Sequence, residues 1–462
     1  MSSREPTPAQ LRAYSTLNRN LLVNAGAGSG KTWVLAERFV HLLAHPHESG
    51  ITSVSQIVAI TFTTRAAQEM RARVRERLNQ RLAIAADDDE RARWARHVQE
   101  MDGARISTIH ALAAALLRAN AAELDEALDP AFAVLDETQS RLLADAAVDD
   151  ALRDTPPGDP ALAVFAEYSA DVVLDELRAA VTRPLPSLPA DPLAHWASVQ
   201  ADLWEMMRPG VIAKLSAALD LWLPIGLPPD DVLADHWRAA LRALELMQAE
   251  PSDWAEALRL IAAIKRNGGK QAAWGGKDVL DDAKSRLEAV QALGKSTASW
   301  LGSPVNAAPD GPDARAAALL ACWHSLVERA QARYAELKAA RAALDFDDLE
   351  RLALALLEKD SVRTRYDGAE FRHVMVDEFQ DTSETQWAII RHLANPARPG
   401  ALFLVGDPKQ SIYGFRGADA RVFDQARRAV EDDGGAVIPL ARSFRTHATL
   451  VEQFNALFRQ VL

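Results

Sequence analysis

Short apolar runs alternate with amphipathic stretches over the opening third of the chain. The clearest stretch carries apolar residues at helical spacing, namely Val34, Leu35, Phe39, Leu42 and Leu43. The predicted strands are residues 20–24, 56–62 and 105–107, and the predicted helices are residues 31–43, 65–78 and a stretch that ends at 122. Because strands alternate with helices, the pattern predicts βαβ units and a parallel sheet.

The pattern changes between residues 135 and 341. Ala, Leu and Trp recur at helical spacing, prolines break the pattern, and β-branched runs are rare, so this region is predicted to be a helical insertion with an apolar core. Its core residues are expected to include Trp204, Trp222 and Trp237. The alternation then resumes with strands at 374–377, 401–405 and 436–440 and helices at 384–393, 420–430 and 447–462. The predicted class is therefore α/β, with a parallel sheet interrupted by a large, mostly α-helical insertion.

Composition adds a size limit and a charge argument. With 462 residues, 48% of them hydrophobic, the chain has room for roughly three domains and a sizeable core. The formal net charge of −12 argues weakly against a polyanionic partner. Local charge differs, because residues 65–81 hold six arginines and only two acids.

The sequence also indicates a compartment. The single cysteine, Cys322, excludes an internal disulfide and fits a reducing cytosol. The first residues lack the apolar core of a secretory signal, and the most apolar stretch, 211–229, contains Lys214 and Asp220. We therefore expect a cytoplasmic protein with no membrane partner.

A glycine-rich segment follows the first predicted strand. Its glycines allow backbone N–H groups to approach phosphate oxygens, Lys31 neutralises their charge, and Thr32 supplies an oxygen ligand for Mg²⁺. Ala25 stands where the general pattern has glycine. The predicted nucleotide-binding residues are Ala25, Gly26, Ala27, Gly28, Ser29, Gly30, Lys31 and Thr32.

A second segment, residues 376–382, follows the predicted strand that ends near Val376. Asp377 suits the shell of a Mg²⁺ ion, and Glu378 can orient or deprotonate an attacking water. Taken alone, the pair is explained equally well by two solvated acids at a strand end. Together with the P-loop, it predicts hydrolysis of a nucleoside triphosphate.

A third segment, residues 404–419, places a polar hook after a strand. The amide of Gln410 can sense a γ-phosphate, while Tyr413 and Phe415 can stack on bases, at about 1–3 kcal/mol each, beside Arg416. Such an arrangement would link the nucleotide state to the grip on a single strand. The alternative is a loop whose aromatic residues only pack.

These segments resemble the UvrD/Rep-type superfamily 1A DNA helicases, and among them the AddA/RecB branch of helicase–nucleases. The resemblance covers residues 1–137 and 341–462, and residues 128–136 favour the branch. Ala25 is usual in this family. Residues 345–349 resemble the return from the insertion, and their acids are predicted to cap a helix.

The resemblance implies further site residues. Gln10 would read adenine, and Arg445 would direct its guanidinium at the γ-phosphate, beside Phe444, which keeps a face for adenine but lacks the usual tyrosine hydroxyl. Ser443 replaces the usual asparagine. The residues implied to contact the DNA strand are Phe62, Thr63, Arg65, Thr108, His110, Tyr413, Phe415 and Arg416.

The resemblance also implies domains and a function. Residues 1–107 and 341–432 would form a RecA-like ATPase core, 108–340 a helical insertion, and 433–462 the beginning of a second RecA-like domain. The implied activity is 3′→5′ translocation or unwinding in double-strand break repair and recombination. It would use ATP and Mg²⁺ on single-stranded or partially duplex DNA, with the second component of a helicase–nuclease as partner.

Two alternatives stay open. The chain resembles the N-terminal portion of a longer enzyme, so it can instead be a module that binds ATP and single-stranded DNA without cycling. A P-loop small-molecule kinase or GTPase is the other alternative, but it gives the hook at 404–419 no purpose.

Overall fold

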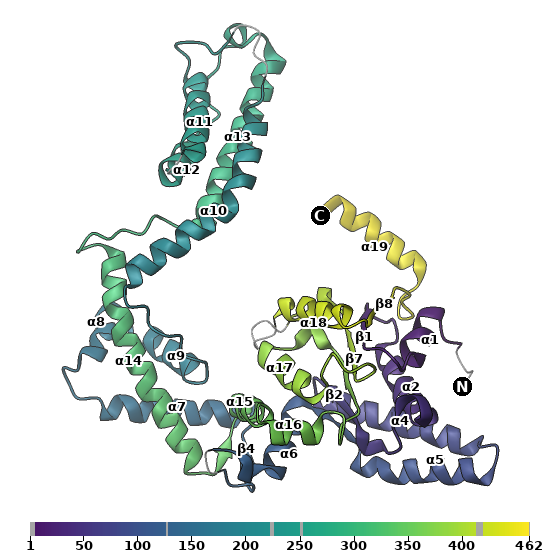
Figure 1. The fold of residues 1–462 in the computed structure, drawn as a ribbon. Helices are drawn as coiled ribbons and strands as arrows, with labels where there is room; N and C mark the ends of the chain where they lie inside the picture. The colour runs from purple at the N-terminus through teal and green to yellow at the C-terminus, as the bar shows by residue number, and fades with distance from the viewer. Residues whose placement is uncertain (1–4, 126–127, 222–225, 250–252, 413–418, 462) are drawn as a thin grey trace. The chain divides into compact units, whose positions relative to one another are not determined.

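The computed structural model describes residues 5–125, 128–221, 226–249, 253–412 and 419–461. It divides into two compact units (Figure 1). The first, here called the sheet unit, comprises Met1–Leu143 and Ala335–Leu462. The second, the insertion unit, comprises Ala144–Tyr334. The predicted α/β class with a helical insertion is confirmed.

The sheet unit contains a six-stranded parallel sheet in the order β3-β2-β6-β7-β1-β8. In register, Val23 of β1 lies opposite Val405 of β7 and Ile438 of β8. The central strands are buried on both faces, which explains their continuous apolar sequences. The strands are β1 (Leu21–Ala25), β2 (Ile57–Thr61), β3 (Arg105–Thr108), β6 (His373–Val376), β7 (Leu402–Gly406) and β8 (Ala436–Leu440). A separate two-stranded sheet pairs β4 (Ala133–Val134) with β5 (Ala343–Leu344).

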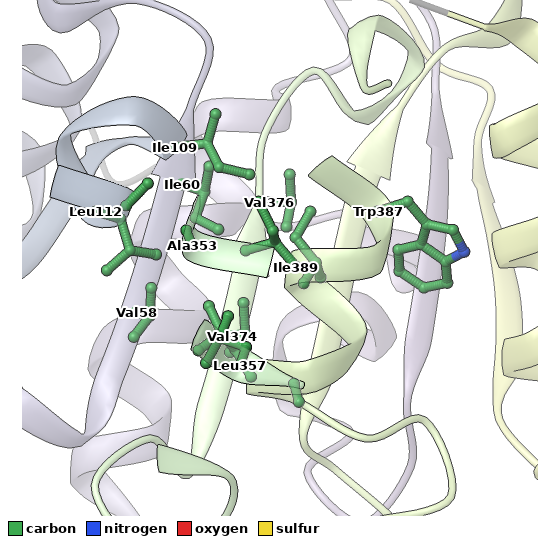
Figure 2. Packing of buried hydrophobic residues seen from close by; sticks show 14 of the residues in the cluster. Val58, Ile60, Ile109, Leu112, Ala353, Leu357, Val374, Val376, Trp387 and Ile389 are labelled. Carbon is green, nitrogen blue, oxygen red and sulfur yellow. The ribbon is translucent and has the colours of Figure 1, made fainter. Parts of the chain in front are cut away.

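Alternate residues of each strand face two different helical layers. On one face Val58 and Ile60 of β2 pack in a cluster with residues of α6, α15 and α17 (Figure 2). On the other face Ile57 and Ala59 pack with α1, α2, α4 and α5. The first layer comprises α6 (Ile109–Ala119), α15 (Phe346–Leu357), α16 (Asp360–Tyr366), α17 (Glu384–Leu393) and α18 (Ala420–Asp432). The second comprises α1 (Pro8–Ser15), α2 (Lys31–Ala44), α4 (Thr64–Ala83) and α5 (Asp88–Glu100), and α3 (Pro46–Ser49) follows α2.

Two details of the predicted domain boundaries differ from the structure. The predicted insertion began at residue 108, but α6 packs in the core against the sheet, and the division falls after Leu143. The predicted second domain began at 433, but β8 pairs with β1 in the first sheet. The local pattern identifies a strand, whereas its neighbours depend on pairing with distant residues. Helix α19 (Ala448–Val461) follows β8.

The acids at 345–349 cap a helix, as predicted. Asp345 accepts a hydrogen bond from the backbone N–H of Asp348, and the Asp348 carboxylate accepts one from the backbone N–H of Asp345. This reciprocal capping box satisfies two N–H groups at the start of α15.

The insertion unit is helical and has its own apolar core. Trp204, Trp237 and Trp274 are buried with aliphatic residues of α10 to α13, and α10 and α13 run side by side (Figure 1). The predicted core positions Trp204 and Trp237 are thus confirmed, while Trp222 lies outside the described residues. The helices from the start of this region are α7 (Glu137–Asp154), α8 (Val164–Glu167), α9 (Ala170–Val181), α10 (Pro192–Leu219), α11 (Val232–Gln248), α12 (Trp254–Ala262), α13 (Lys277–Leu301) and α14 (Pro312–Ala339). Among the described residues, no helix has the length and apolarity that crossing a membrane requires.

Candidate functional site

The P-loop connects β1 to α2 and presents its backbone at the carboxyl end of the sheet. Gly28 and Gly30 have φ angles of 73° and 89°, in the left-handed region that favours glycine. Gly30 is the N-cap of α2 and provides no side-chain cap, so the first N–H groups of the helix can receive an anion. The buried hydroxyl of Ser29 has no hydrogen-bond partner within the described parts of the chain. This cradle fits a phosphate group.

Lys31 brings the P-loop to the acidic segment after β6. Its Nζ donates to Glu378 Oε2 at 2.5 Å, although the two residues are 347 positions apart. The Lys31 side chain is 11% exposed and that of Glu378 is 38% exposed, so the pair lies partly shielded from water. Such a charge-assisted hydrogen bond fixes both groups in one geometry.

Asp377 is a buried carboxyl group beside this pair. It is 8% exposed, and its backbone N–H donates to Ile60 O at 2.9 Å. Burial, helped by the charge of Glu378 and opposed by that of Lys31, raises the pKa of Asp377 to about 7. A nearby divalent cation would stabilise the ionised form, so the site suits a metal ion.

The predicted metal ligands have the right chemistry for Mg²⁺. Thr32, in the first turn of α2, offers a hydroxyl oxygen, and Asp377 offers carboxylate oxygens. The described residues contain no group of three or more His, Cys, Asp or Glu side chains able to hold a metal. Mg²⁺ does not require one, because it commonly takes one or two protein ligands together with phosphates and waters.

Glu378 has an unusual backbone conformation. Its φ of 51° is left-handed, which is uncommon for a residue other than glycine and is often found at functional sites. Its N–H donates to Asp377 Oδ1 at 3.0 Å. Close by, burial and the charge of Glu378 raise the pKa of Asp381, whose Oδ1 is buried without a hydrogen-bond partner among the residues described.

The predicted phosphate sensor, Gln410, follows β7. Its Nε2 donates to Asp407 Oδ2 at 2.5 Å. A Cβ built on Gly26 would lie 4.0 Å from the same Asp407 oxygen, so this loop lies against the P-loop. The structure therefore brings Gln410 to the phosphate site, with its amide held by Asp407.

Gln10 contacts the P-loop backbone. Its backbone N–H donates to Thr7 Oγ1, and its Oε1 accepts from the Thr7 N–H, which forms a capping box at the start of α1. Its Nε2 donates to Ser29 O at 2.9 Å. The side chain is buried, and its Nε2 would lie only 2.9 Å from a Cβ built on Gly30. Gln10 thus lies beside the predicted nucleotide site.

The segment after β8 also lies on the P-loop. The Phe444 N–H donates to Gly28 O at 2.8 Å. A Cβ on Gly28 would lie 2.6 Å from Arg445 Cβ and 2.8 Å from Ser443 Oγ, so only glycine permits this approach. The pairing of β8 with β1 is what places Phe444 and Arg445 here.

Several residues predicted to contact DNA follow β2 and β3, at the end of the strand order away from β1. Thr63 and Thr108 are N-caps, and their hydroxyls accept from the N–H groups of Ala66 and Ala111. Arg65 is exposed and pairs with Glu69 at 3.2 Å. Phe62 is half-buried. The two threonines therefore have structural roles in helix capping whatever else they contact.

His110 is held by two neighbours from later parts of the chain. Its ring nitrogen Nε2 lies 2.9 Å from Glu350 Oε1, and Gln386 donates to the same oxygen at 2.6 Å. The His110 ring stacks on Phe346 with centroids 4.3 Å apart. The residues at the carboxyl ends of β2 and β3 thus connect to α15 and α17.

The arginine-rich helix α4 is largely occupied by internal contacts. Arg71 donates to the carbonyls of Ala104 and Ile106, and the side chains of Arg75 and Arg77 pair with Asp102 and Glu37. The positive charge of residues 65–81 is therefore less available to a polyanion than the sequence suggests. Three other predicted DNA contacts, Tyr413, Phe415 and Arg416, lie outside the described residues.

The sequence did not single out Gln380 and Asp407. Both are buried, and the Asp407 N–H donates to Gln380 Oε1 at 2.9 Å. The available signal was an amide placed between acids directly after a strand, which local patterns treat as part of the acidic motif.

Comparisons with known proteins agree with this geometry. The family model described as the UvrD/REP helicase N-terminal domain matches residues 6–186 and 309–431. Proteins named as the AddA component of an ATP-dependent helicase/nuclease are similar along 99% of the chain: 31% identical in Levilactobacillus brevis, 30% in Geobacillus kaustophilus and 28% in Exiguobacterium sibiricum. The matches cover 38%, 39% and 40% of those relatives, so the chain spans about two fifths of their length.

Proposed function

The chain belongs to the UvrD/REP helicase family, and on this premise we propose that it forms the ATP-hydrolysing part of a DNA helicase or translocase that acts in DNA repair. The observation that carries the proposal is the contact between Lys31 Nζ and Glu378 Oε2 at 2.5 Å. It unites a phosphate cradle and a buried acidic pair from segments on either side of the insertion.

The proposed chemistry assigns one role to each residue of the site. Backbone N–H groups of the P-loop and Lys31 bind the phosphates of ATP, and Thr32 and Asp377 hold Mg²⁺. When bound, Mg²⁺ neutralises charge that develops on the phosphate oxygens. Lys31 turns from Glu378 to the phosphates, which leaves Glu378 Oε2 free to accept a proton from the attacking water.

The remaining residues act on the nucleotide from its other sides. Gln10 contacts the base, Phe444 stacks on it, and Arg445 approaches the γ-phosphate. These roles rest on the family pattern together with the contacts of Gln10 and Phe444 to the P-loop backbone. Gln410 reports the presence of the γ-phosphate through its link to Asp407.

The proposed DNA contacts lie along the same edge of the sheet. Phe62, Arg65 and His110 follow β2 and β3, and the segment that holds Tyr413, Phe415 and Arg416 follows β7. Movement is proposed to run 3′→5′ on single-stranded DNA, as the family pattern implies. The relatives are named as one component of a helicase/nuclease, which supports the other component of such an enzyme as partner.

The test is ATP turnover by the purified chain with and without single-stranded DNA. We expect DNA to stimulate turnover, and Lys31→Ala to reduce it by at least about 100-fold, because one preorganised charge on the transferring group is worth that much. Duplexes with a 3′ or a 5′ tail test the direction. Equal turnover by wild type and Lys31→Ala would overturn the proposal, whereas ATP and DNA binding without turnover supports a binding module that does not cycle.

A further inference from the structure

Gln380 is a buried amide with three hydrogen bonds inside the acidic region. It lies in the 3-10 turn Phe379–Asp381 and is 4% exposed. Its Nε2 donates to Glu378 Oε2 at 2.9 Å and to Asp381 Oδ2 at 3.2 Å. Its Oε1 accepts from the Asp407 N–H at 2.9 Å. The side chain therefore joins the segment after β6 to the segment after β7.

The close approach of these two segments depends on Gly406. A Cβ at that position would lie 2.7 Å from Gln380 Oε1 and 3.1 Å from the Gln380 backbone nitrogen. The absence of a side chain at the end of β7 is thus what allows Gln380 to reach Asp407. Asp407 in turn accepts from Gln410 Nε2, so the contacts continue to the proposed phosphate sensor.

Only an amide satisfies these neighbours. Two of them are carboxylates that need donors, and the third is a backbone N–H that needs an acceptor. A glutamate at 380 would still accept from Asp407, but it would place a further negative charge against Glu378 and Asp381. An aliphatic residue would satisfy none of the three.

We propose that Gln380 is a positioning residue that holds the Glu378 carboxylate in its working orientation and clamps the Asp407–Gln410 loop to it. This inference rests on the proposed function. Glu378 Oε2 receives two hydrogen bonds, from Lys31 and Gln380. When phosphates draw Lys31 away, Gln380 is the group that keeps this carboxylate aimed, and it couples the aim to the position of Gln410.

Hydrogen–deuterium exchange tests the clamp independently of catalysis. In Gln380→Leu the Asp407 N–H loses its acceptor, so exchange in residues 405–410 is expected to rise by at least about tenfold. Gln380→Glu retains an acceptor oxygen and should keep slow exchange there. Gln331→Glu is the matched control, because Gln331 Nε2 donates to Ala180 O and Arg183 O in the insertion unit. Unchanged exchange in Gln380→Leu would overturn the clamp.

Steady-state ATP turnover tests the effect on Glu378. Both Gln380 variants are expected to lower kcat by about tenfold to 100-fold, with KM for ATP within about threefold of wild type, since misplacing a catalytic group costs rate more than binding. A kcat within twofold of wild type in Gln380→Glu, or an equal loss in Gln331→Glu, would overturn the positioning role. If wild type itself does not hydrolyse ATP, the proposed function fails, and the exchange result alone decides whether Gln380 holds the loop.

Discussion

The sheet unit and the insertion unit treat buried charge in opposite ways. In the sheet unit, burial raises the pKa values of Asp377 and Asp381, which follow β6. In the insertion unit, hydrogen bonds from Arg333 and Arg329 lower the pKa values of Asp150 and Asp159. The first pattern is unfavourable for an isolated protein and typical of a functional site, whereas the second is typical of structural ion pairs. The contrast locates the chemistry in the sheet unit.

The largest expected effect comes from removing the proposed water-orienting carboxylate. Glu378→Gln is expected to lower kcat for ATP by roughly 10²–10⁴-fold, the usual contribution of a general base, while ATP binding persists. The matched change is Glu288→Gln in the insertion unit, where Glu288 forms an exposed pair with Arg266. Stopped-flow binding and steady-state turnover measure both. A loss of similar size in Glu288→Gln would remove the distinction between the two units.

The next effect is a pH dependence of stability with opposite signs in the two units. Because the folded pKa of Asp377 is raised to about 7, the native state holds its proton more tightly than the unfolded state does, and stability falls as pH rises from about 4 to 7. Asp377→Asn lacks this loss. Its unfolding free energy relative to wild type should therefore increase between pH 4.5 and 8, by up to about 4 kcal/mol at 1.36 kcal/mol per pKa unit.

Asp159→Asn provides the opposite case. The pKa of Asp159 is lowered, so its contribution to stability is present at neutral pH and is lost on acidification. This variant should be less stable than wild type at pH 7 and approach wild type near pH 3. Calorimetric unfolding of both variants across the pH range tests the pair, and parallel pH profiles for the two would contradict the contrast.

The smallest expected effect is a loss of stability without a loss of chemistry. Asp231 caps α11 through the N–H groups of Leu233 and Ala234 and also accepts from Trp274 Nε1 at 3.3 Å. Asp231→Ala should lower the unfolding free energy by about 1–2 kcal/mol, as expected for loss of an N-cap. DNA-free ATP turnover should stay within twofold of wild type. Thermal unfolding and turnover measured on one preparation separate the two results.

Sequence predicted the elements of this protein better than their neighbours. The helix at 384–393 and the strand at 436–440 match the structure residue for residue, because caps and apolar runs are local signals. The pairing of β8 with β1 was not predictable in this way, since parallel pairing joins residues more than 400 positions apart.

The site divides along the same line. Glycines, Lys31 and Asp377 indicate phosphate chemistry through residue type and spacing alone. Arg38 gives no such signal: it lies on a helix like an ordinary surface arginine, yet it is buried and donates to Ala13 O, Thr16 O and His373 Nε2. Contacts of this kind, like those of Gln380, depend on side chains from distant segments and are visible only in three dimensions.

The order of strands in the sheet also constrains how the chain can assemble during synthesis. Of the three strands translated before the insertion, only β2 and β3 are neighbours; β1 borders β7 and β8, and β2 otherwise borders β6. The central seam of the sheet therefore cannot close until the ribosome has passed residue 406, and until then β1 has no partner strand in this sheet. A large loop must be closed before these distant contacts stabilise the fold, which slows folding and exposes apolar edges to chaperones in the meantime.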